Sequence, residues 1–431
     1  MTSQAQSRPG HRPKEPAAPD AGGPPAALVA VRRLFATETP NFFLLLGTTL
    51  FLVIFGLVMV LSSSSIESRV AGGSFFTSFL KQAMFAAIAI PLMLLASRMP
   101  IAFWKRMARP AIMLGLGLQL LVFTPLGAEY GGNRNWLKIF GLTLQPSELV
   151  KLALIVWIAF VLTRLSGDLN DPKRFLIPVG VASVVSLGLV LVGKDLGTAV
   201  IMLFIVFGCL FFAGVKLRYL GVASIVVAAL GLVFAFASSS RTNRINAWIN
   251  GCTEEQYYTF CWQPMHGTWA LASGGIFGVG LGNSKAKWSW LPEADNDYIF
   301  SIIGEELGLI GAIVVLLLFI VLAIGFIRII RANTDPFARI VTSGVMIWLV
   351  GQALVNVAVV LGLLPVLGVP LPLISAGGSA LISSLLAIGV VLSFARKAPE
   401  FSAFSADGSH SVLTPAERSR RAAADRLRTR S

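Results

Sequence analysis

Long apolar runs separated by short polar loops constrain this chain more than any other feature. Hydrophobic residues fill 55% of its 431 positions and charged residues only 13%, which excludes a soluble globular protein. About 20 apolar residues in a helix span the hydrocarbon core of a bilayer. Ten such runs occur, near residues 41–61, 79–97, 108–125, 148–164, 175–193, 198–214, 219–237, 299–327, 340–362 and 374–395. We therefore predict an all-α integral membrane protein, a bundle of ten transmembrane helices.

The distribution of Lys and Arg predicts the orientation of this bundle. If the N-terminus is cytoplasmic, the short inner loops are denser in basic residues than the outer loops, as the positive-inside rule requires. An even number of spans then places the C-terminus in the cytoplasm too. The net charge of +14 is explained by inner loops and tails attracted to anionic lipid. We exclude nucleic acid as a partner, because no soluble domain presents a basic groove.

Three regions follow from this pattern. Residues 1–38 are rich in Pro, Gly and Ala and predict a disordered cytoplasmic tail. Residues 39–396 hold the ten spans, with a large extracytoplasmic loop between the seventh and eighth. Residues 397–431 form a basic cytoplasmic tail that meets lipid headgroups or a cytoplasmic protein, or is simply a solvated charged end.

Asp195 lies in a short polar step between the fifth and sixth apolar runs, on the outer side of the membrane. An ionisable side chain at such a boundary is costly unless paired or hydrated, which favours a functional role. Asp195 also stands three residues before Thr198 and can cap the next helix. Position alone leaves both interpretations open.

Cations and glycines gather in the predicted outer segments. Between residues 273 and 284, glycines at alternate positions allow backbone N–H groups to approach an anion, although the same pattern is typical of a flexible turn. The candidate anion-binding cations are Arg134, Lys138, Lys194, Arg244, Lys285 and Lys287.

Four charged residues within apolar runs have structural interpretations. Glu148 and Lys151 are three residues apart and can pair on one helix face. Glu305 and Glu306 are consecutive carboxylates in an apolar helix, so at least one must face protein or water. We expect that one to meet a basic residue from another span.

Polar residues also occur in the last two spans. Gln352 and Asn356 share a helix face, which predicts an interhelical hydrogen bond. The segment 364–379 is broken by Pro and Gly, and such backbone is tolerated at membrane depth only where it is buried in protein or lines a wet cavity. Ser375 and Ser379 lie in it and are candidates to contact a substrate there.

Cys252 and Cys261 share the large outer loop. An oxidising exterior permits a disulfide between them. We predict no metal site in this loop, because His266 is the only histidine nearby and the spacing of metal ligands is absent.

The outer motifs together carry a family resemblance. They are Gln145–Leu149, Lys194–Thr198, Gly280–Ser284, Leu291–Ala294, Phe300–Gly308 and Pro370–Ser375. In these motifs the chain closely resembles the SEDS family of bacterial peptidoglycan polymerases, over roughly residues 40–396. The sequence of the motif Ile303–Glu306 is more similar to the cell-division branch of the family than to its elongation branch. Two departures, Lys194 for a common proline and Ala376 for a common tyrosine, affect the shape of the expected pocket.

This resemblance implies a glycosyltransferase that polymerises lipid II on the outer face of the cytoplasmic membrane, at the division septum. It implies that Asp195 is the catalytic base, which takes the proton of a sugar hydroxyl. The outer cations would stabilise the pyrophosphate leaving group. No ligand cluster demands a cofactor, and a divalent cation, Mg²⁺ or Mn²⁺, is left open. One carboxylate without a nucleophilic partner favours direct displacement with inversion.

The resemblance also implies partners: a class B penicillin-binding protein, the septal transpeptidase, and other division proteins that meet the cytoplasmic tails. Three alternatives stay open at this point. A lipid II flippase suits broken helices and intramembrane carboxylates. An elongation-type polymerase shares the fold, and a scaffold without chemistry would only assemble division proteins.

Overall fold

The computed structural model describes residues 38–396, except 71, 131, 140–141, 166–171, 237–238 and 289. The predicted tails lie outside the described residues, apart from Glu38. Thr39–Arg396 form one compact unit.

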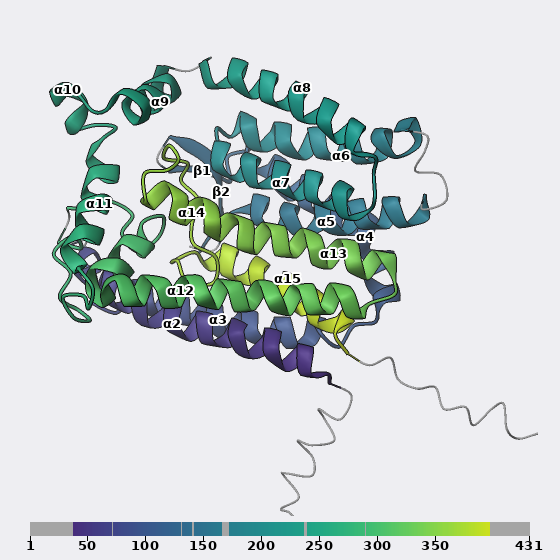
Figure 1. Ribbon diagram of the computed structural model, residues 1–431, viewed down its shortest axis with the longest axis horizontal. Helices are drawn as coiled ribbons and strands as arrows, with labels where there is room; N and C mark the ends of the chain where they lie inside the picture. The colour runs from purple at the N-terminus through teal and green to yellow at the C-terminus, as the bar shows by residue number, and fades with distance from the viewer. Residues whose placement is uncertain are drawn as a thin grey trace, which may run out of the picture. The chain divides into compact units, whose positions relative to one another are not determined.

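Helices make up most of this unit (Figure 1). Those that fall on the predicted spans are α2 (Pro40–Val70), α3 (Thr77–Ala96), α4 (Ile101–Leu121), α5 (Pro146–Arg164), α6 (Pro172–Val192), α7 (Leu196–Phe212), α8 (Leu217–Phe236), α12 (Ile299–Ala332), α13 (Pro336–Met346), α14 (Gln352–Val360) and α15 (Gly378–Phe394). A π-helical turn, Ile347–Gly351, joins α13 to α14. In the described part of the chain, six helices are long and apolar enough to cross a membrane, with α13 and α14 counted as one. The prediction of a helical, multi-pass membrane protein is confirmed.

Helix α5 is the core of the bundle. It is buried on nearly every face, from Pro146 to Leu162, and it contacts α4, α6, α7, α13 and α15. A helix that is apolar all round is stable only when other helices surround it. Since Pro146 is its first residue, the helix also fixes where the preceding Gln145 lies.

A small antiparallel sheet corrects the all-α prediction. Its strands β1 (Gly127–Tyr130), β2 (Asn133–Ile139) and β3 (Leu142–Leu144) lie in sequence order between α4 and α5. In β2, buried Asn135 and Leu137 alternate with exposed Arg134 and Lys138. This period of two is typical of a half-buried strand.

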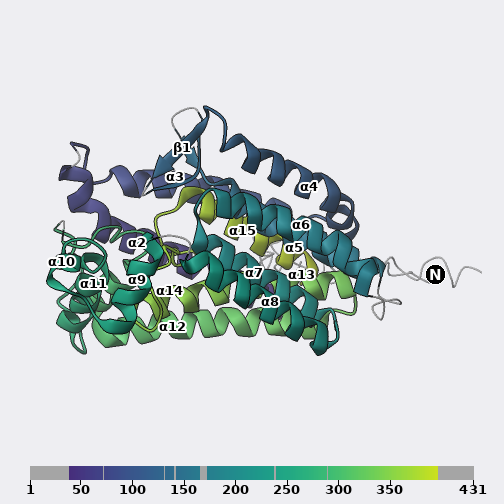
Figure 2. The same ribbon diagram turned by 90° about the horizontal axis from the view of Figure 1, so that it is seen from above.

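The segment between α8 and α12 folds into three short helices. These are α9 (Ser239–Asn250), α10 (Glu254–Tyr257) and α11 (Trp262–Gly274), and they lie together at one end of the bundle (Figures 1 and 2). A disulfide joins Cys252 to Cys261 across α10.

The glycine-rich segment after α11 folds back against α12. The N–H groups of Val279 and Gly280 donate to the carbonyls of Glu305 and Glu306, at 2.9 and 3.0 Å. The α12 backbone breaks at Gly308, whose φ of 69° favours glycine. This break leaves α12 carbonyls available to the folded-back segment.

Candidate active site

Asp195 is the N-cap of α7, as the capping interpretation requires. Its Oδ1 accepts a hydrogen bond of 2.9 Å from the N–H of Thr198. Its Oδ2 accepts one of 3.0 Å from Nε2 of Gln145. The residue is only 7% exposed. Burial raises the pKa of its carboxyl group, and the bonds from Thr198 oppose that shift. Asp195 is therefore a nearly covered carboxylate with donors on both oxygens.

Two glycines hold the Asp195 step tightly between other segments. The Gly193 carbonyl accepts a hydrogen bond from the N–H of Arg134 in β2, at 3.0 Å. A Cβ at Gly193 would collide with the side chain of Asn135, and one at Gly197 with the Leu367 carbonyl. The small sheet and the broken segment before α15 thus clamp this step from two sides.

Gln145 connects Asp195 to the last helix of the chain. Its backbone N–H donates to Oγ of Ser379 at 3.1 Å, while its side chain holds Asp195. Ser379 is 7% exposed. Ser379 therefore has a backbone partner, and its contact with a substrate stays a prediction.

Asp297 is the functional candidate that we missed in the sequence. It lies just before α12 and is partly exposed. The pKa of its carboxyl group is raised to about 7, mainly by burial and further by the charges of Glu293, Asp195 and Asp295. In the described part of the chain, no hydrogen-bond donor contacts this carboxylate. The signal in the sequence is the group of three carboxylates, Glu293, Asp295 and Asp297.

Three consecutive carbonyls fix the backbone around Asp297. Those of residues 295, 296 and 297 accept hydrogen bonds, in order, from the N–H of Ala376 at 2.8 Å, Oγ of Ser375 at 2.7 Å and Nδ2 of Asn356 at 2.7 Å. Nδ2 of Asn356 also donates to the Val369 carbonyl, at 2.7 Å. Asn356 and Ser375 therefore bond the loop that carries Asp297, and the substrate contact of Ser375 stays a prediction.

Backbone strain is concentrated in the same three segments. Among the described residues, the non-glycine residues with positive φ are Lys194 (66°), Glu293 (55°) and Leu373 (68°). The first adjoins Asp195, the second lies four residues before Asp297, and the third lies two before Ser375. Strain of this kind persists where surrounding contacts enforce it, often at functional sites.

The predicted anion-binding cations are distributed unevenly. Nε and Nη2 of Arg134 donate to the carbonyls of Val122 and Thr124, at 3.2 and 3.0 Å. Lys287 is buried in an ion pair with Glu306, with an Nζ–Oε1 distance of 3.3 Å. The remaining candidates are exposed, and they are Lys138, Lys194, Arg244 and Lys285. Lys194 adjoins Asp195, and the charge of Arg244 reaches the hydroxyl of Tyr298, the residue after Asp297.

The partners of Glu305 and Glu306 correct our expectation of a basic residue from another span. The cation is Lys287, which belongs to the loop that folds back against α12. Oγ of Ser62 in α2 also donates to Glu306, at 2.7 Å. Glu305 accepts hydrogen bonds from the N–H of Lys285 at 2.8 Å and from the hydroxyl of Ser284. The two carboxylates therefore hold the loop against α12 and α2.

Glu148 and Lys151 form a buried ion pair, with an Nζ–Oε1 distance of 2.8 Å. Nζ of Lys151 also donates to Oε1 of Gln352 at 3.0 Å and lies 4.7 Å from the centre of the Trp348 ring. The charges of this pair act on Asp195 in opposite directions. The pair joins α5 to α14 and supports the floor of the site. Among the described residues, no group of three or more His, Cys, Asp or Glu side chains is placed to hold a metal ion.

Comparisons with known proteins agree with this arrangement. The model of the cell cycle protein family that includes FtsW, RodA and SpoVE matches residues 43–400. The chain is 38% identical over 363 residues to a probable peptidoglycan glycosyltransferase FtsW of Mycobacterium tuberculosis. This match covers 84% of this chain and 68% of that protein. A protein of the same name from Trichlorobacter lovleyi is 35% identical over 341 residues, covering 78% and 88%.

Solved structures show the same fold. A chain from a peptidoglycan synthase complex, described as coordinating polymerization and crosslinking, is 25% identical with a TM-score of 0.67, covering 81% of this chain and 95% of that one. The rod shape determining protein RodA of Thermus thermophilus is 25% identical with a TM-score of 0.60, covering 82% and 96%. Sequence and structure agree that this chain belongs to the FtsW/RodA/SpoVE family of cell cycle proteins.

Proposed function

We propose that the chain is a peptidoglycan glycosyltransferase that polymerises lipid II on the outer face of the cytoplasmic membrane. One observation carries the proposal: two carboxylates, Asp195 and Asp297, lie on separate segments that meet the same stretch of chain, with Leu367 against Gly197 and Gly368 beside Asp297. The relatives named above as peptidoglycan glycosyltransferases support it.

We assign the general base to Asp297 in place of Asp195. A base must reach the proton that it removes, and its pKa is best placed near the working pH. The carboxylate of Asp297 is partly exposed and its pKa is about 7. Both oxygens of Asp195 already accept hydrogen bonds. Asp195 therefore acts through Asp297, since its charge adds to burial and to the charge of Glu293 in raising the pKa of that base.

In the reaction, Asp297 takes the proton of the acceptor sugar's 4-hydroxyl group as the oxygen attacks the anomeric carbon of the donor. The bond from that carbon to the lipid pyrophosphate breaks, and the electron pair leaves with the pyrophosphate. Lys194 is exposed and adjoins Asp195 in the sequence, so we assign it to the developing negative charge. One accessible base favours inversion at the anomeric carbon.

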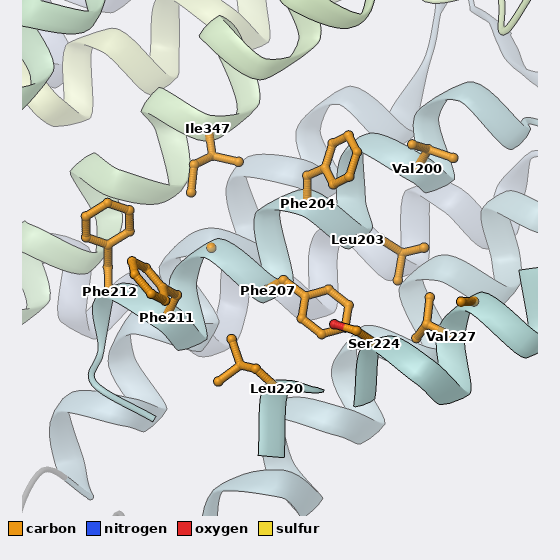
Figure 3. Close-up of a pocket in the computed structure, with 12 residues that line it drawn as sticks. Val200, Leu203, Phe204, Phe207, Phe211, Phe212, Leu220, Ser224, Val227 and Ile347 are labelled. Atoms are coloured by element: carbon orange, nitrogen blue, oxygen red, sulfur yellow. The ribbon is translucent and has the colours of Figure 1, made fainter. Parts of the chain in front are cut away.

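An apolar groove supports a lipid-linked substrate. It has a volume of about 520 Å³ and lies between α7 and α8, with Ile347 at its rim (Figure 3). Phe204, Phe207, Phe211 and Leu220 line it. Such a surface suits the polyprenyl tail of lipid II, because apolar walls bind an apolar chain without polar groups to satisfy.

The number of membrane crossings, the location in the cell and the partner protein are part of the same proposal. We propose ten membrane crossings with both tails cytoplasmic, since a helix occupies every predicted span. We place the enzyme at the division septum, because the curated relatives carry the FtsW name. The related synthase complex, in which polymerization and crosslinking are coordinated, supports a class B penicillin-binding protein as partner.

Polymerisation of lipid II by the purified full-length protein tests this function, with and without a cognate class B penicillin-binding protein. We expect Asp297→Asn to abolish glycan synthesis, and Glu129→Gln, which changes an exposed carboxylate on β1, to leave it unchanged. Asp297→Asn should still fold, because a raised pKa means that the fold favours the neutral form of this side chain. Normal polymerisation by Asp297→Asn would contradict the mechanism, and lipid II transport without polymerisation would favour the flippase alternative.

A further inference from the structure

A second cavity, of about 290 Å³, lies between the outer helices and the broken segment before α15. Arg244 and Trp248 of α9 line one side, Trp269 of α11 another, and residues 362–366 a third. Figures 1 and 2 show α9, α11 and α14 together at this end of the bundle. The cavity is distinct from the apolar groove between α7 and α8 and shares no lining residue with it.

The walls of this cavity are held in place. Nε1 of Trp248 donates to the Gly362 carbonyl at 2.9 Å, which fixes the orientation of the indole ring. The disulfide between Cys252 and Cys261 braces the link from α9 to α11, and both cysteines line the cavity. Trp248 and Trp269 nevertheless remain 45% and 50% exposed. Two partly exposed indole rings therefore stand in a braced concave site.

The chemistry of the walls suits a sugar better than a lipid chain. A pyranose ring presents C–H groups that pack on an aromatic face and hydroxyl groups that need polar partners or water. An exposed arginine, Arg244, beside the two indoles adds hydrogen-bond donors for sugar hydroxyl groups. A purely apolar tail would gain nothing from Arg244.

The cavity adjoins the two carboxylates through one continuous stretch of chain. Residues 362–366 lead directly into Leu367, whose carbonyl lies against Gly197, and Gly368, where a Cβ would be 3.5 Å from Oδ2 of Asp297. The charge of Arg244 reaches Tyr298. A saccharide chain reacting at Asp297 can therefore extend into this cavity.

We infer that this cavity is a saccharide subsite, in which Trp248 and Trp269 stack on a sugar next to the reacting one and Arg244 donates to its hydroxyl groups. The inference rests on the proposed function, since it names the position of one part of the substrate.

Binding of a lipid-free tetrasaccharide, made of alternating N-acetylglucosamine and N-acetylmuramic acid, tests the subsite. Calorimetry on the full-length Asp297→Asn protein in nanodiscs separates binding from turnover. We expect Trp269→Ala to weaken binding about tenfold, the scale of one lost stacking contact, and Trp269→Phe to restore most of it. Trp288→Ala, at a residue that is 61% exposed and does not line the cavity, is the matched control and should bind normally.

Equal weakening by Trp288→Ala, or normal binding by Trp269→Ala, would overturn the subsite, as would absence of tetrasaccharide binding. Restoration by phenylalanine separates loss of stacking from misfolding. Tryptophan-dependent binding in a protein whose native form makes no glycan would reject the proposed function and leave a saccharide site in place.

Discussion

At the scale of single residues, two carboxylates in different surroundings account for the chemistry. Asp195 is covered, caps a helix and accepts two hydrogen bonds. Asp297 is partly exposed and its pKa is raised to about 7. Environments that separate the behaviour of two neighbouring acids are a common way to assign their roles. In the proposed mechanism they assign proton transfer to Asp297 and electrostatic support to Asp195.

This division of roles predicts unequal effects of two substitutions. Asp297→Asn should lower kcat by about 10²- to 10⁴-fold, the typical contribution of a general base. Asp195→Asn should lower it only about tenfold, because asparagine can still cap α7. Rates of lipid II polymerisation at saturating substrate measure both. An equal loss of kcat in the two variants would contradict this division of roles and favour Asp195 as the general base.

The difference between the two aspartates also shows what a sequence reveals at this scale. The position of Asp195 between two apolar runs and its spacing to Thr198 are local, so they were visible. The surroundings of Asp297 depend on Ser375 and Asn356, which are remote in sequence. No local pattern indicates that these side chains bond the carbonyls beside it.

At the scale of elements, the broken segment between α14 and α15 organises the site. It lies against Gly197 near Asp195 and supplies donors to the carbonyls of residues 295 and 296. Its prolines and glycines leave backbone groups free to bond other segments instead of a helix of their own. The prediction that this segment is buried or lines a wet cavity follows from the same freedom.

A substitution of Asn356 tests whether the hydrogen bonds that hold the Asp297 loop matter for catalysis. Asn356→Ala leaves the carbonyls of Asp297 and Val369 without their donor, at a cost of about 1 to 3 kcal/mol in folding stability. We expect kcat to fall about tenfold with KM nearly unchanged, because the base shifts while the binding surfaces stay.

Asn333→Ala is the matched control for this prediction. Nδ2 of Asn333 also donates to two carbonyls, of Ile329 and Phe394, at 3.0 and 3.1 Å, but these lie at the opposite end of α12 from Asp297. A similar loss of stability with normal kcat is expected. If both variants lost activity in proportion to stability, Asn356 would have no special role in positioning.

The loop held by Glu305 and Glu306 gives a second prediction at this scale. Lys287→Met removes the cation that is ion-paired with buried Glu306, and breaking one partner of a buried pair costs about 3 to 5 kcal/mol. Tm in detergent should fall clearly in Lys287→Met. In the double variant Lys287→Met with Glu306→Gln, Tm should return most of the way to the native value, because no unpaired charge then remains. A double variant less stable than the single one would refute this pairing.

At the scale of the whole molecule, composition predicted the membrane bundle and the motifs predicted the family. Apolar length is a strong signal, because a bilayer requires it of every spanning helix. The small sheet was missed because a short strand such as β3 carries a weak signal beside long helices. The partner of Glu306 was missed because the segment after α11 folds back against α12, a tertiary contact that spacing along the sequence does not encode.

The whole bundle acts on the reaction by bringing separate segments to one place. The Asp195 step, the acidic loop before α12 and the broken segment are far apart in sequence, and helices such as α5 hold them together. The account therefore depends on electrostatic coupling between Asp195 and Asp297, which solution measurements can detect.

The pH dependence of kcat/KM for lipid II polymerisation, compared between the native protein and Asp195→Asn, measures this coupling most directly. The base must be deprotonated, so the native rate should rise with pH and level off above about 7. Since the charge of Asp195 raises the pKa of Asp297, the inflection should move to lower pH in Asp195→Asn. An inflection that stays in place in that variant, or a native rate that does not change between pH 5 and 8, would contradict the account.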